Sequence, residues 1–345
     1  MKKFEFGNRV FIIAEVSGNH NGSYETAEKI VRAACEAGVD AVKLQTYPLD
    51  EVTIDSDKKW FQVNVNDAWK GRKLIDLYKL VYTPWEWQEK LKRIAEEEYD
   101  VLCFSTPFGL RAVDFLEQIG VQAYKIASFE IGDLELLKKI GETKKPVIFS
   151  TGLANLDEIE LAYKTLKDSG CPKIGILYCI SSYPADPDQM NLSTLPNLKE
   201  KFPEAVIGLS DHTLTTETAV AGVAFGAKII EKHITLRRSD GGPDSGFSLE
   251  PQEFKELVRQ ARNVEKSIGK PTYGVGEREK ENLVFKRSLF IVKDIRKGEI
   301  FTRDNVKSIR PGYGLAPKFL DKIIGRIARE DIERGTPISW DLVEE

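Results

Sequence analysis

The chain is poor in the residues that mark several common classes of protein. Its 345 residues include only three histidines, four cysteines and two methionines. The cysteines are scattered and form no CxxC pair, which argues against a zinc knuckle or a disulfide framework and fits a reduced cytoplasm. Because His20, His212 and His233 are the only histidines, the position of each one is informative.

Long apolar runs and strongly basic segments are missing as well. The longest apolar runs have the length of a strand, which excludes a bilayer-spanning segment, and residues 1–9 are not followed by the apolar stretch of a signal peptide. The formal net charge is −4, from 54 acidic and 50 basic residues, and no Lys/Arg-dense or basic aromatic stretch occurs. We therefore expect a cytoplasmic protein that binds neither nucleic acid nor a membrane.

Eight apolar segments of strand length are spread over the first 268 residues. They are continuous apolar runs more than alternating ones, as expected of parallel strands that are covered on both faces. A Gly-rich GxGxxG turn, which a doubly wound nucleotide-binding sheet would need, is absent. The segments are 10–17, 41–47, 101–107, 123–128, 146–152, 174–182, 205–213 and 228–236.

Helical periodicity fills the intervals between these segments. Apolar residues in 27–35 recur at i, i+3, i+4 and i+7, and Ser23 and Gly38 are suited to the two ends of that helix. Asn155 is a good N-cap for a later helix. Eight strands, each followed by a helix, predict a (β/α)8 TIM barrel as the catalytic domain over residues 1–269.

The rest of the chain has a different character. Residues 270–282 have the composition of a linker, and residues 283–345 contain an internal repeat at 294–306 and 331–343. Both copies follow the pattern D-I-x-[KR]-G-x-x-[FI]-[ST]-x-D-x-V, which we interpret as strand, glycine turn and strand. The segment therefore predicts a small β domain with pseudo-twofold character. Within the first domain, the polar connection 48–84 is much longer than a usual βα loop and is predicted to be a functional lid.

Polar residues stand at the end of every predicted strand. In a TIM barrel the active site lies at the C-terminal ends of the strands, and packing alone would not require polar side chains there. In strand order these residues are Glu15, Asn19 and His20; Lys43 and Gln45; Ser105 and Thr106; Lys125, Ser128 and Glu130; Ser150 and Thr151; Ser181, Ser182 and Tyr183; Ser210, Asp211 and His212; Glu231 and His233.

Two of the three histidines end neighbouring strands. Side-chain alternation places His212 on the face of Ser210 and His233 on the face of Glu231. Two imidazoles from adjacent strands can converge on one divalent ion, which would keep open positions for water and substrate. A pair of hydrogen-bonded core histidines is the alternative. Asp211 and Glu231 can be ligands, groups that orient the ligands, or solvated side chains.

Lys43 and Lys125 interrupt otherwise apolar strands, and a buried lysine has to be paired or functional. They can cradle a phosphate or carboxylate, form a Schiff base as in barrel aldolases, or extend to solvent at the rim. Glu15 is either a general acid–base or the ion-pair partner of one of these lysines. Asp244 lies in a loop that either folds over the same rim or is only a turn. Hydroxyls available to a phosphate cradle belong to Thr106, Ser128, Ser150 and Thr151.

Ordered motifs along the whole chain resemble the sialic acid synthase family, and the C-terminal segment resembles its antifreeze-like (SAF) domain. The resemblance implies a (β/α)8 barrel followed by a small β-clip domain. It also implies a transferase that condenses phosphoenolpyruvate with an amino sugar to give a nine-carbon 2-keto-3-deoxy acid and phosphate. The motifs are FIIAEVSGNH at 11–20, VKLQT at 42–46, YKIAS at 124–128, STG at 150–152, GLSDHT at 208–213 and IEKHIT at 230–235.

Within the family the chain most resembles the pseudaminic acid branch, whose sugar substrate is 2,4-diacetamido-2,4,6-trideoxy-L-altrose. N-acetylneuraminate synthases usually carry Glu where Asn21 stands, and bacterial ones carry Asn, which contacts N-acetylmannosamine, where Ser181 stands. The N-acetylneuraminate, legionaminate and spore-coat branches are the alternatives. The segments similar to the pseudaminic acid branch are 45–57, 69–78, 83–87, 123–130 and 317–319.

The resemblance also implies roles for individual residues. His212 and His233 would hold Mn²⁺, or alternatively Mg²⁺ or Co²⁺, as a Lewis acid for the sugar aldehyde. Glu15 would handle the proton of the attacking water. Arg310 would reach from the SAF domain into the site of a partner subunit, which implies a domain-swapped homodimer. Phosphoenolpyruvate would be held by Lys43, Thr106, Lys125, Ser128, Ser150 and Ser182, and the sugar by Gln45, Tyr183 and Asp244.

Two other functions compete with this one. A Schiff-base aldolase acting on pyruvate would use one of the buried lysines as its nucleophile. A carbohydrate- or ice-binding protein would use the C-terminal domain and carry a decayed barrel. The complete set of polar strand ends argues against decay of the barrel.

Overall fold

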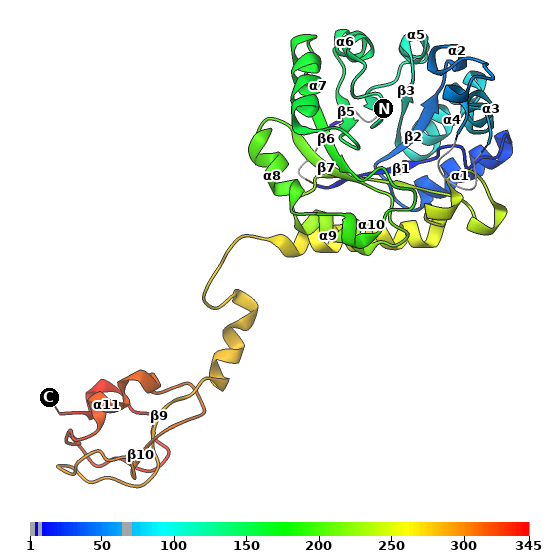
Figure 1. Ribbon diagram of the computed structural model, residues 1–345. Coiled ribbons are helices and arrows are strands. Elements are labelled where there is room, and N and C mark those ends of the chain that lie inside the picture. Colours follow the sequence, from blue (N-terminus) through cyan, green and yellow to red (C-terminus); the bar gives the residue numbers. More distant parts are fainter. Residues whose placement is uncertain (1–3, 6–8, 64–70, 345) are drawn as a thin grey trace. The chain divides into compact units, whose positions relative to one another are not determined.

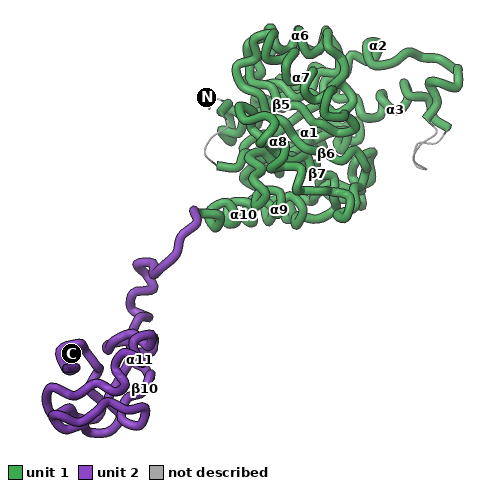
Figure 2. Tube along the Cα trace, turned by 60° about the vertical axis from the view of Figure 1, so that its left-hand side comes forward, with its two compact units in different colours: residues 1–269 green, residues 270–345 purple. Residues whose placement is uncertain are grey.

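The computed structural model of the protein describes residues 4–5, 9–63 and 71–344. Contacts divide the chain into two compact units, Met1–Gly269 and Lys270–Glu345, which Figure 2 colours separately. The expectation that no signal peptide is present concerns residues 1–9, most of which lie outside the described residues. Within the described ranges, no helix is both long enough and apolar enough to cross a membrane.

The first unit contains a closed barrel of eight parallel strands in sequence order (Figure 1). Each strand pairs with the next, and the last pairs with the first. The predicted TIM barrel is confirmed. Every strand is shorter than its predicted segment, because those segments included residues of the adjoining turns. The strands are β1 (Phe11–Glu15), β2 (Ala41–Thr46), β3 (Leu102–Pro107), β4 (Tyr124–Ile126), β5 (Val147–Ser150), β6 (Ile174–Cys179), β7 (Val206–Asp211) and β8 (Ile229–His233).

A principal helix follows each strand and packs on the outside of the barrel (Figure 1). Ser23 caps the first of them by accepting a hydrogen bond from the backbone N–H of Thr26, and Asn155 forms a reciprocal capping box with Glu158, so both predicted caps are confirmed. The helices are α1 (Tyr24–Glu36), α4 (Trp85–Arg93), α5 (Leu110–Gln118), α6 (Leu134–Glu142), α7 (Leu156–Asp168), α8 (Thr194–Lys201), α9 (Glu217–Ala224) and α10 (Pro251–Ile268).

The strands are buried on both faces, as their continuous apolar sequences predict. In β1, Phe11, Ile13 and Glu15 share the face toward the barrel interior, and Ile12 and Ala14 lie on the face toward the helices. All five side chains are buried. Apolar residues therefore fill the barrel until the C-terminal ends of the strands, where charged residues such as Glu15 take their place.

The long connection 48–84 folds over part of the barrel mouth. It contains α2 (Leu49–Val52), a 3₁₀ turn (Lys59–Phe61) and α3 (Leu74–Val81), and its residues 64–70 lie outside the described residues. Gly18, just after β1, permits the close approach of α3, because a Cβ there would lie 3.0 Å from the Cα of Val81. Because residues 64–70 lie outside the described residues, segment 69–78, which resembles the pseudaminic acid branch, is described only from residue 71.

The second unit is a small domain with its own apolar core. Its strands β9 (Ser288–Ile291) and β10 (Val306–Ile309) pair in antiparallel fashion. The predicted linker 270–282 is exposed throughout, and part of it belongs to a 3₁₀ helix, Glu277–Phe285. Core side chains of the unit include Leu289, Ile291, Ile295, Phe301, Val306, Ile323, Ala328, Ile332 and Ile338.

The two sequence repeats are related by pseudo-twofold symmetry. Ile295 and Ile332, which are equivalent positions, exchange backbone hydrogen bonds of 2.9 and 2.7 Å. Asp294 accepts from the backbone N–H of Arg334, and Asp331 accepts from that of Lys297, both at 2.7 Å. The predicted glycine turns are present at Gly298 and Gly335, but most of the predicted strands beside them are only isolated bridges, such as that between Ile295 and Ile332.

Candidate active site

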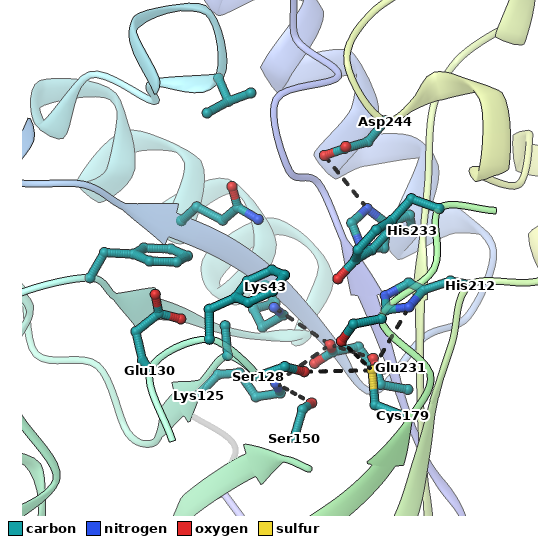
Figure 3. A pocket seen from close by; sticks show the side chains of 18 of the residues that line it. Lys43, Lys125, Ser128, Glu130, Ser150, Cys179, His212, Glu231, His233 and Asp244 are labelled. Carbon is teal, nitrogen blue, oxygen red and sulfur yellow. Dashed lines mark hydrogen bonds and ion pairs between the residues drawn. The ribbon is translucent and has the colours of Figure 1, made fainter. Parts of the chain in front are cut away.

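A cavity of about 580 Å³ opens at the C-terminal ends of the barrel strands, a size within the usual range of small-ligand sites (Figure 3). Polar residues from β2, β4, β5, β6, β7 and β8 line it, and the lid helix α3 adds an apolar wall. Ser210 and His212 both line the cavity, and so do Glu231 and His233, as the alternation along these two strands predicts. The polar lining residues are Lys43, Gln45, Lys125, Ser128, Glu130, Ser150, Ser181, Ser182, Tyr183, Ser210, His212, Glu231, His233 and Asp244.

Lys43, which lines this cavity, forms an ion pair with Glu15, which does not. They are register partners on β1 and β2, and the Lys43 Nζ lies 2.7 Å from the Glu15 Oε2. The Glu15 side chain is fully buried, and burial outweighs the attraction of Lys43 and raises the pKa of Glu15 to about 7. Between the two hypotheses for Glu15, the structure shows the ion pair, and a pKa near neutrality also suits proton transfer.

Lys125 lies beside this pair and is also buried. Its Nζ donates to the Ser150 Oγ at 2.7 Å and lies 3.8 Å from the Glu231 Oε1, which is 3.6 Å from the Lys43 Nζ. Burial lowers the pKa of Lys125. Burial would raise the pKa of Glu231, but the two ammonium groups hold it below its usual value. Glu231, whose role the sequence left open, is therefore the carboxylate shared by the two lysines.

The two lysines do not extend to solvent, which rules out one of the three hypotheses for them. Thr106 does not line the cavity wall but accepts a hydrogen bond of 3.3 Å from the Lys43 Nζ, so it still belongs to the cluster. Two ammonium groups with hydroxyls near the ends of β3, β4 and β5 beside them have the chemistry to bind an anion in place of their carboxylate partners. Ser182 lines the same cavity, and its hydroxyl donates to the Pro184 carbonyl at 2.9 Å.

His212 and His233 face each other at the cavity wall, with ring centroids 5.4 Å apart (Figure 3). The Nδ1 of His212 lies 2.9 Å from the Ile180 carbonyl, which can only accept, so in the neutral ring Nδ1 carries the proton and Nε2 is free to bind a metal. Burial lowers the pKa of His233 and keeps that ring neutral.

The surroundings of the imidazoles also fit a divalent ion. The Nδ1 of His233 is buried without a hydrogen-bond partner in the described structure and lies 4.0 Å from the Asp244 Oδ2. Among the described residues, no group of three or more His, Cys, Asp or Glu side chains is arranged to hold a metal. An ion bound here would have two imidazole ligands and would complete its coordination with water and substrate.

The residues expected to meet the sugar lie around the same cavity. The Gln45 Oε1 accepts from the Tyr47 hydroxyl at 3.0 Å, and Tyr183 packs its ring 4.5 Å from that of His212. Asp244 accepts a hydrogen bond from the Ser17 hydroxyl, so its loop folds over the rim. Burial raises the pKa of Asp244. The loop containing Asp244 is therefore part of the site and not merely a turn.

Three residues named in the sequence analysis stand elsewhere. Asp211 points away from the cavity and pairs with Lys232 on the outer face of the barrel. Asn21 is not among the lining residues, and its amide donates to the Gly241 carbonyl at 3.1 Å. Arg310 is an exposed residue of the second unit, so its role in a partner's site stays a prediction.

The third histidine is structural. His20 accepts from the backbone N–H of Gly22 at Nδ1, so its Nε2 carries the proton and donates to the Thr83 Oγ1 at 3.0 Å. Burial lowers the pKa of His20 to about 4. The side chain fastens the end of the lid connection to the loop after β1.

Sequence reasoning missed several lining residues. Glu130 was noted only as polar, yet it lines the cavity, its Oε2 is buried without a hydrogen-bond partner in the described part of the chain, and burial raises its pKa to about 7. Cys179 lies 3.8 Å from the Nδ1 of His212. The lid supplies Leu77, Tyr78 and Val81. For these three lid residues, the unusual length of the connection 48–84 was the only signal in the sequence.

Comparisons with known proteins agree with the motifs. The NeuB family model matches residues 30–273, and the SAF domain model matches residues 286–344. A pseudaminic acid synthase of Campylobacter jejuni (strain 81-176) is 44% identical over 332 residues, which cover 96% of each chain. A pseudaminic acid synthase of Helicobacter pylori is 37% identical over 334 residues, which cover 96% of this chain and 97% of the relative.

The fold also matches a solved structure of the same kind. The N-acetylneuraminic acid (sialic acid) synthetase of Leptospira borgpetersenii, solved in complex with citrate, superposes with a TM-score of 0.71 at 34% identity, covering 80% of this chain and 91% of that one. The family models, the relatives matched over nearly their full length and the fold thus indicate the same family. The chain belongs to the NeuB family, whose members are phosphoenolpyruvate-dependent transferases, and it ends in a SAF domain.

Proposed function

We propose that the protein condenses phosphoenolpyruvate with 2,4-diacetamido-2,4,6-trideoxy-L-altrose, giving pseudaminic acid and phosphate. The observation that carries this proposal is one cavity in which two buried lysines face two imidazoles. The lysines suit the anionic substrate, and the imidazoles suit an ion that activates an aldehyde. The choice of sugar is supported by the relatives that carry the name pseudaminic acid synthase, at 44% and 37% identity over nearly the full chain.

Phosphoenolpyruvate is placed at the lysine end of the cavity. Lys43 and Lys125 would bind its phosphate and carboxylate, with Thr106, Ser128 and Ser150 donating from their hydroxyls and Ser182 from the rim. Glu15 and Glu231 are the anionic partners of these lysines in the structure. Binding of an anion therefore exchanges one set of negative partners for another, and the ammonium groups then stabilise the phosphate as it leaves.

His212 and His233 would hold the divalent ion, for which we propose Mn²⁺, with Mg²⁺ or Co²⁺ as substitutes. The free Nε2 of His212 and the unpartnered Nδ1 of His233 support this assignment. When bound, the ion would supply Lewis-acid polarisation of the aldehyde oxygen of the open-chain sugar. Gln45, Tyr183 and Asp244 surround the same end of the cavity and would orient the sugar.

The bond changes follow from this placement. The C3 of phosphoenolpyruvate attacks the aldehyde carbon and forms the new C–C bond, while the aldehyde oxygen takes up a proton. Water adds to C2, which has become electron-poor, and Glu15, with its pKa near 7, accepts the proton of that water. The bond from C2 to the phosphate oxygen then breaks, leaving the keto acid and inorganic phosphate.

A homodimer would complete the site. We place Arg310 of the partner subunit at the open end of the cavity, where it would contact the sugar. The exposure of Arg310 in a stiff Pro- and Gly-containing loop supports its availability for such a contact. The reaction is placed in the cytoplasm, where phosphoenolpyruvate is produced.

The test is phosphate release from phosphoenolpyruvate with Mn²⁺ against a panel of sugars, with mass detection of the products. We expect turnover with 2,4-diacetamido-2,4,6-trideoxy-L-altrose and loss of turnover in EDTA. Turnover with N-acetylmannosamine or the legionaminate precursor instead would keep the chemistry and overturn the choice of sugar. A Schiff-base aldolase would show lysine labelling by borohydride and pyruvate, whereas this proposal predicts none. No phosphate release with any of the sugars would overturn the proposed reaction.

A further inference from the structure

The buried ion pair between Asp211 and Lys232 lies directly behind the two histidines. The residues are register partners on β7 and β8, and each immediately precedes a histidine of the cavity. Their side chains point outward, toward the helices, while His212 and His233 point inward. Both side chains have 0% exposure, and the Lys232 Nζ lies 2.8 Å from the Asp211 Oδ2.

Lys232 also bonds to the backbone on both sides of His212. Its Nζ donates to the Thr213 carbonyl at 2.5 Å and to the Asp211 carbonyl at 3.5 Å. The Asp211 Oδ1 in turn accepts from the backbone N–H of Thr213 at 2.9 Å, which closes a turn around His212. One ammonium group carried by β8 therefore fixes the backbone that carries the histidine of β7.

We propose that Lys232 is a positioning residue that sets the spacing of the two imidazoles for the divalent ion. The inference rests on the proposed function, since it concerns the ion that His212 and His233 would hold. His212 lies one residue beyond the end of β7, so strand pairing alone does not fix its position. The bonds from Lys232 on β8 to Asp211 and Thr213 fix the separation of the two histidines more directly. The Nδ1 contact with Ile180 orients the ring of His212, and Lys232 orients its backbone.

A purely structural role predicts a different result, and the chain offers a matched control. Lys92 and Glu96 form a largely buried pair away from the site, with 10% and 6% side-chain exposure and a distance of 2.7 Å, and neither residue lines the cavity. Lys232→Met and Lys92→Met each remove one buried ammonium group and retain most of the side-chain volume. Both variants should lose thermal stability, but only Lys232→Met should change the metal site.

The experiment measures Mn²⁺ affinity of the full-length protein without substrates, by electron paramagnetic resonance of free Mn²⁺. Loss of a group that orients metal ligands typically weakens affinity 10–100-fold, and we expect this for Lys232→Met, with Lys92→Met within twofold of wild type. Half-maximal activation of turnover should move to higher Mn²⁺ by the same factor, and saturating Mn²⁺ should restore most of the rate.

The outcomes separate this inference from the proposed function. Wild-type Mn²⁺ binding that His212→Ala abolishes, together with wild-type affinity in Lys232→Met, would overturn the role of Lys232 and leave the metal site standing. No Mn²⁺ binding by the wild type would overturn both. If Lys232→Met does not fold, the double variant Asp211→Asn with Lys232→Met replaces it, because it leaves no unpaired buried carboxylate and the amide oxygen can still accept from Thr213. Unchanged Mn²⁺ affinity in that variant would overturn the inference as well.

Discussion

Replacing Lys43 by methionine should make the stability of the barrel depend on pH above neutrality. The change leaves Glu15 buried without its nearest cation, which lies 2.7 Å away in the wild type. Breaking a buried pair commonly costs about 3–5 kcal/mol when the remaining charge cannot escape. Glu15 can lose its charge by binding a proton, so the loss of stability depends on pH.

The magnitude follows from linkage between proton binding and folding. A carboxyl group whose pKa is raised from 4.5 to about 7 on folding destabilises the wild type progressively between those pH values, by about 3 kcal/mol in all. In Lys43→Met the pKa of Glu15 rises further, so this loss continues beyond pH 7 at about 1.4 kcal/mol for each pH unit. The Glu15 contribution to the difference between variant and wild type is therefore near zero at pH 6 and about 3 kcal/mol at pH 9.

Thermal or urea unfolding of both proteins at pH 6, 7.5 and 9 checks this expectation. A difference of about 3 kcal/mol corresponds to roughly 6 °C in the midpoint for a unit of this size. A loss of unfolding free energy caused by altered packing is the same at every pH. Subtracting the difference measured at pH 6 removes it. The double variant Lys43→Met with Glu15→Gln is the control and should show no added slope. A variant-to-wild-type difference that stays the same from pH 6 to pH 9 would refute the assignment of Glu15 as the group that Lys43 holds ionised.

Other parts of the account make further predictions. Glu130→Gln should remove a titration near pH 7 from the profile of kcat/KM, because burial raises the pKa of Glu130 to about 7; an unaltered profile would exclude Glu130 from the chemistry. Alanine at His212 or His233 should lower turnover at least about a hundredfold, and full activity of the double variant would remove the metal role. Asp294→Ala and Asp331→Ala should each destabilise the second unit by about 1 kcal/mol in unfolding experiments, because each removes one equivalent hydrogen bond; unequal effects would contradict the pseudo-twofold arrangement.

The barrel and most of its polar lining could be predicted from the sequence, because both depend on local periodicity. Continuous apolar runs marked the strands, Lys43 and Lys125 stood out as charges within them, and alternation placed His212 on the face of Ser210 and His233 on the face of Glu231. The rarity of histidine made two of these positions conspicuous. Once eight strands are counted, closure of the barrel brings their ends together without further information.

The pairing of charges inside the site could not be predicted in the same way. Glu15 meets Lys43 through the register of β1 with β2, and Glu231 reaches both lysines from β8. Register between strands is a three-dimensional property that no local pattern encodes. For the same reason the partner of Asp211 could not be predicted: alternation puts Asp211 on the face opposite Ser210 and His212, but its pairing with Lys232 depends on the register of β7 with β8.

The repeat in the second unit shows a related limit. The pattern shared by 294–306 and 331–343 correctly indicated pseudo-twofold symmetry. It indicated a strand, a glycine turn and a strand in each copy, without indicating which segments pair. The structure pairs equivalent residues of the two copies, since Ile295 and Ile332 bond to each other. Symmetry in a sequence shows that two segments are alike, and it does not show which segment each one bonds to.

Isotope tracing tests the central claim most directly. Phosphoenolpyruvate carrying ¹⁸O at the bridging position is incubated with the protein, Mn²⁺ and 2,4-diacetamido-2,4,6-trideoxy-L-altrose, and both products are analysed by mass spectrometry. The account predicts a nine-carbon keto acid without label and inorganic phosphate with one ¹⁸O atom, because the bond from C2 to oxygen breaks. Label retained in the keto acid, or pyruvate formed with no nine-carbon product, would contradict it.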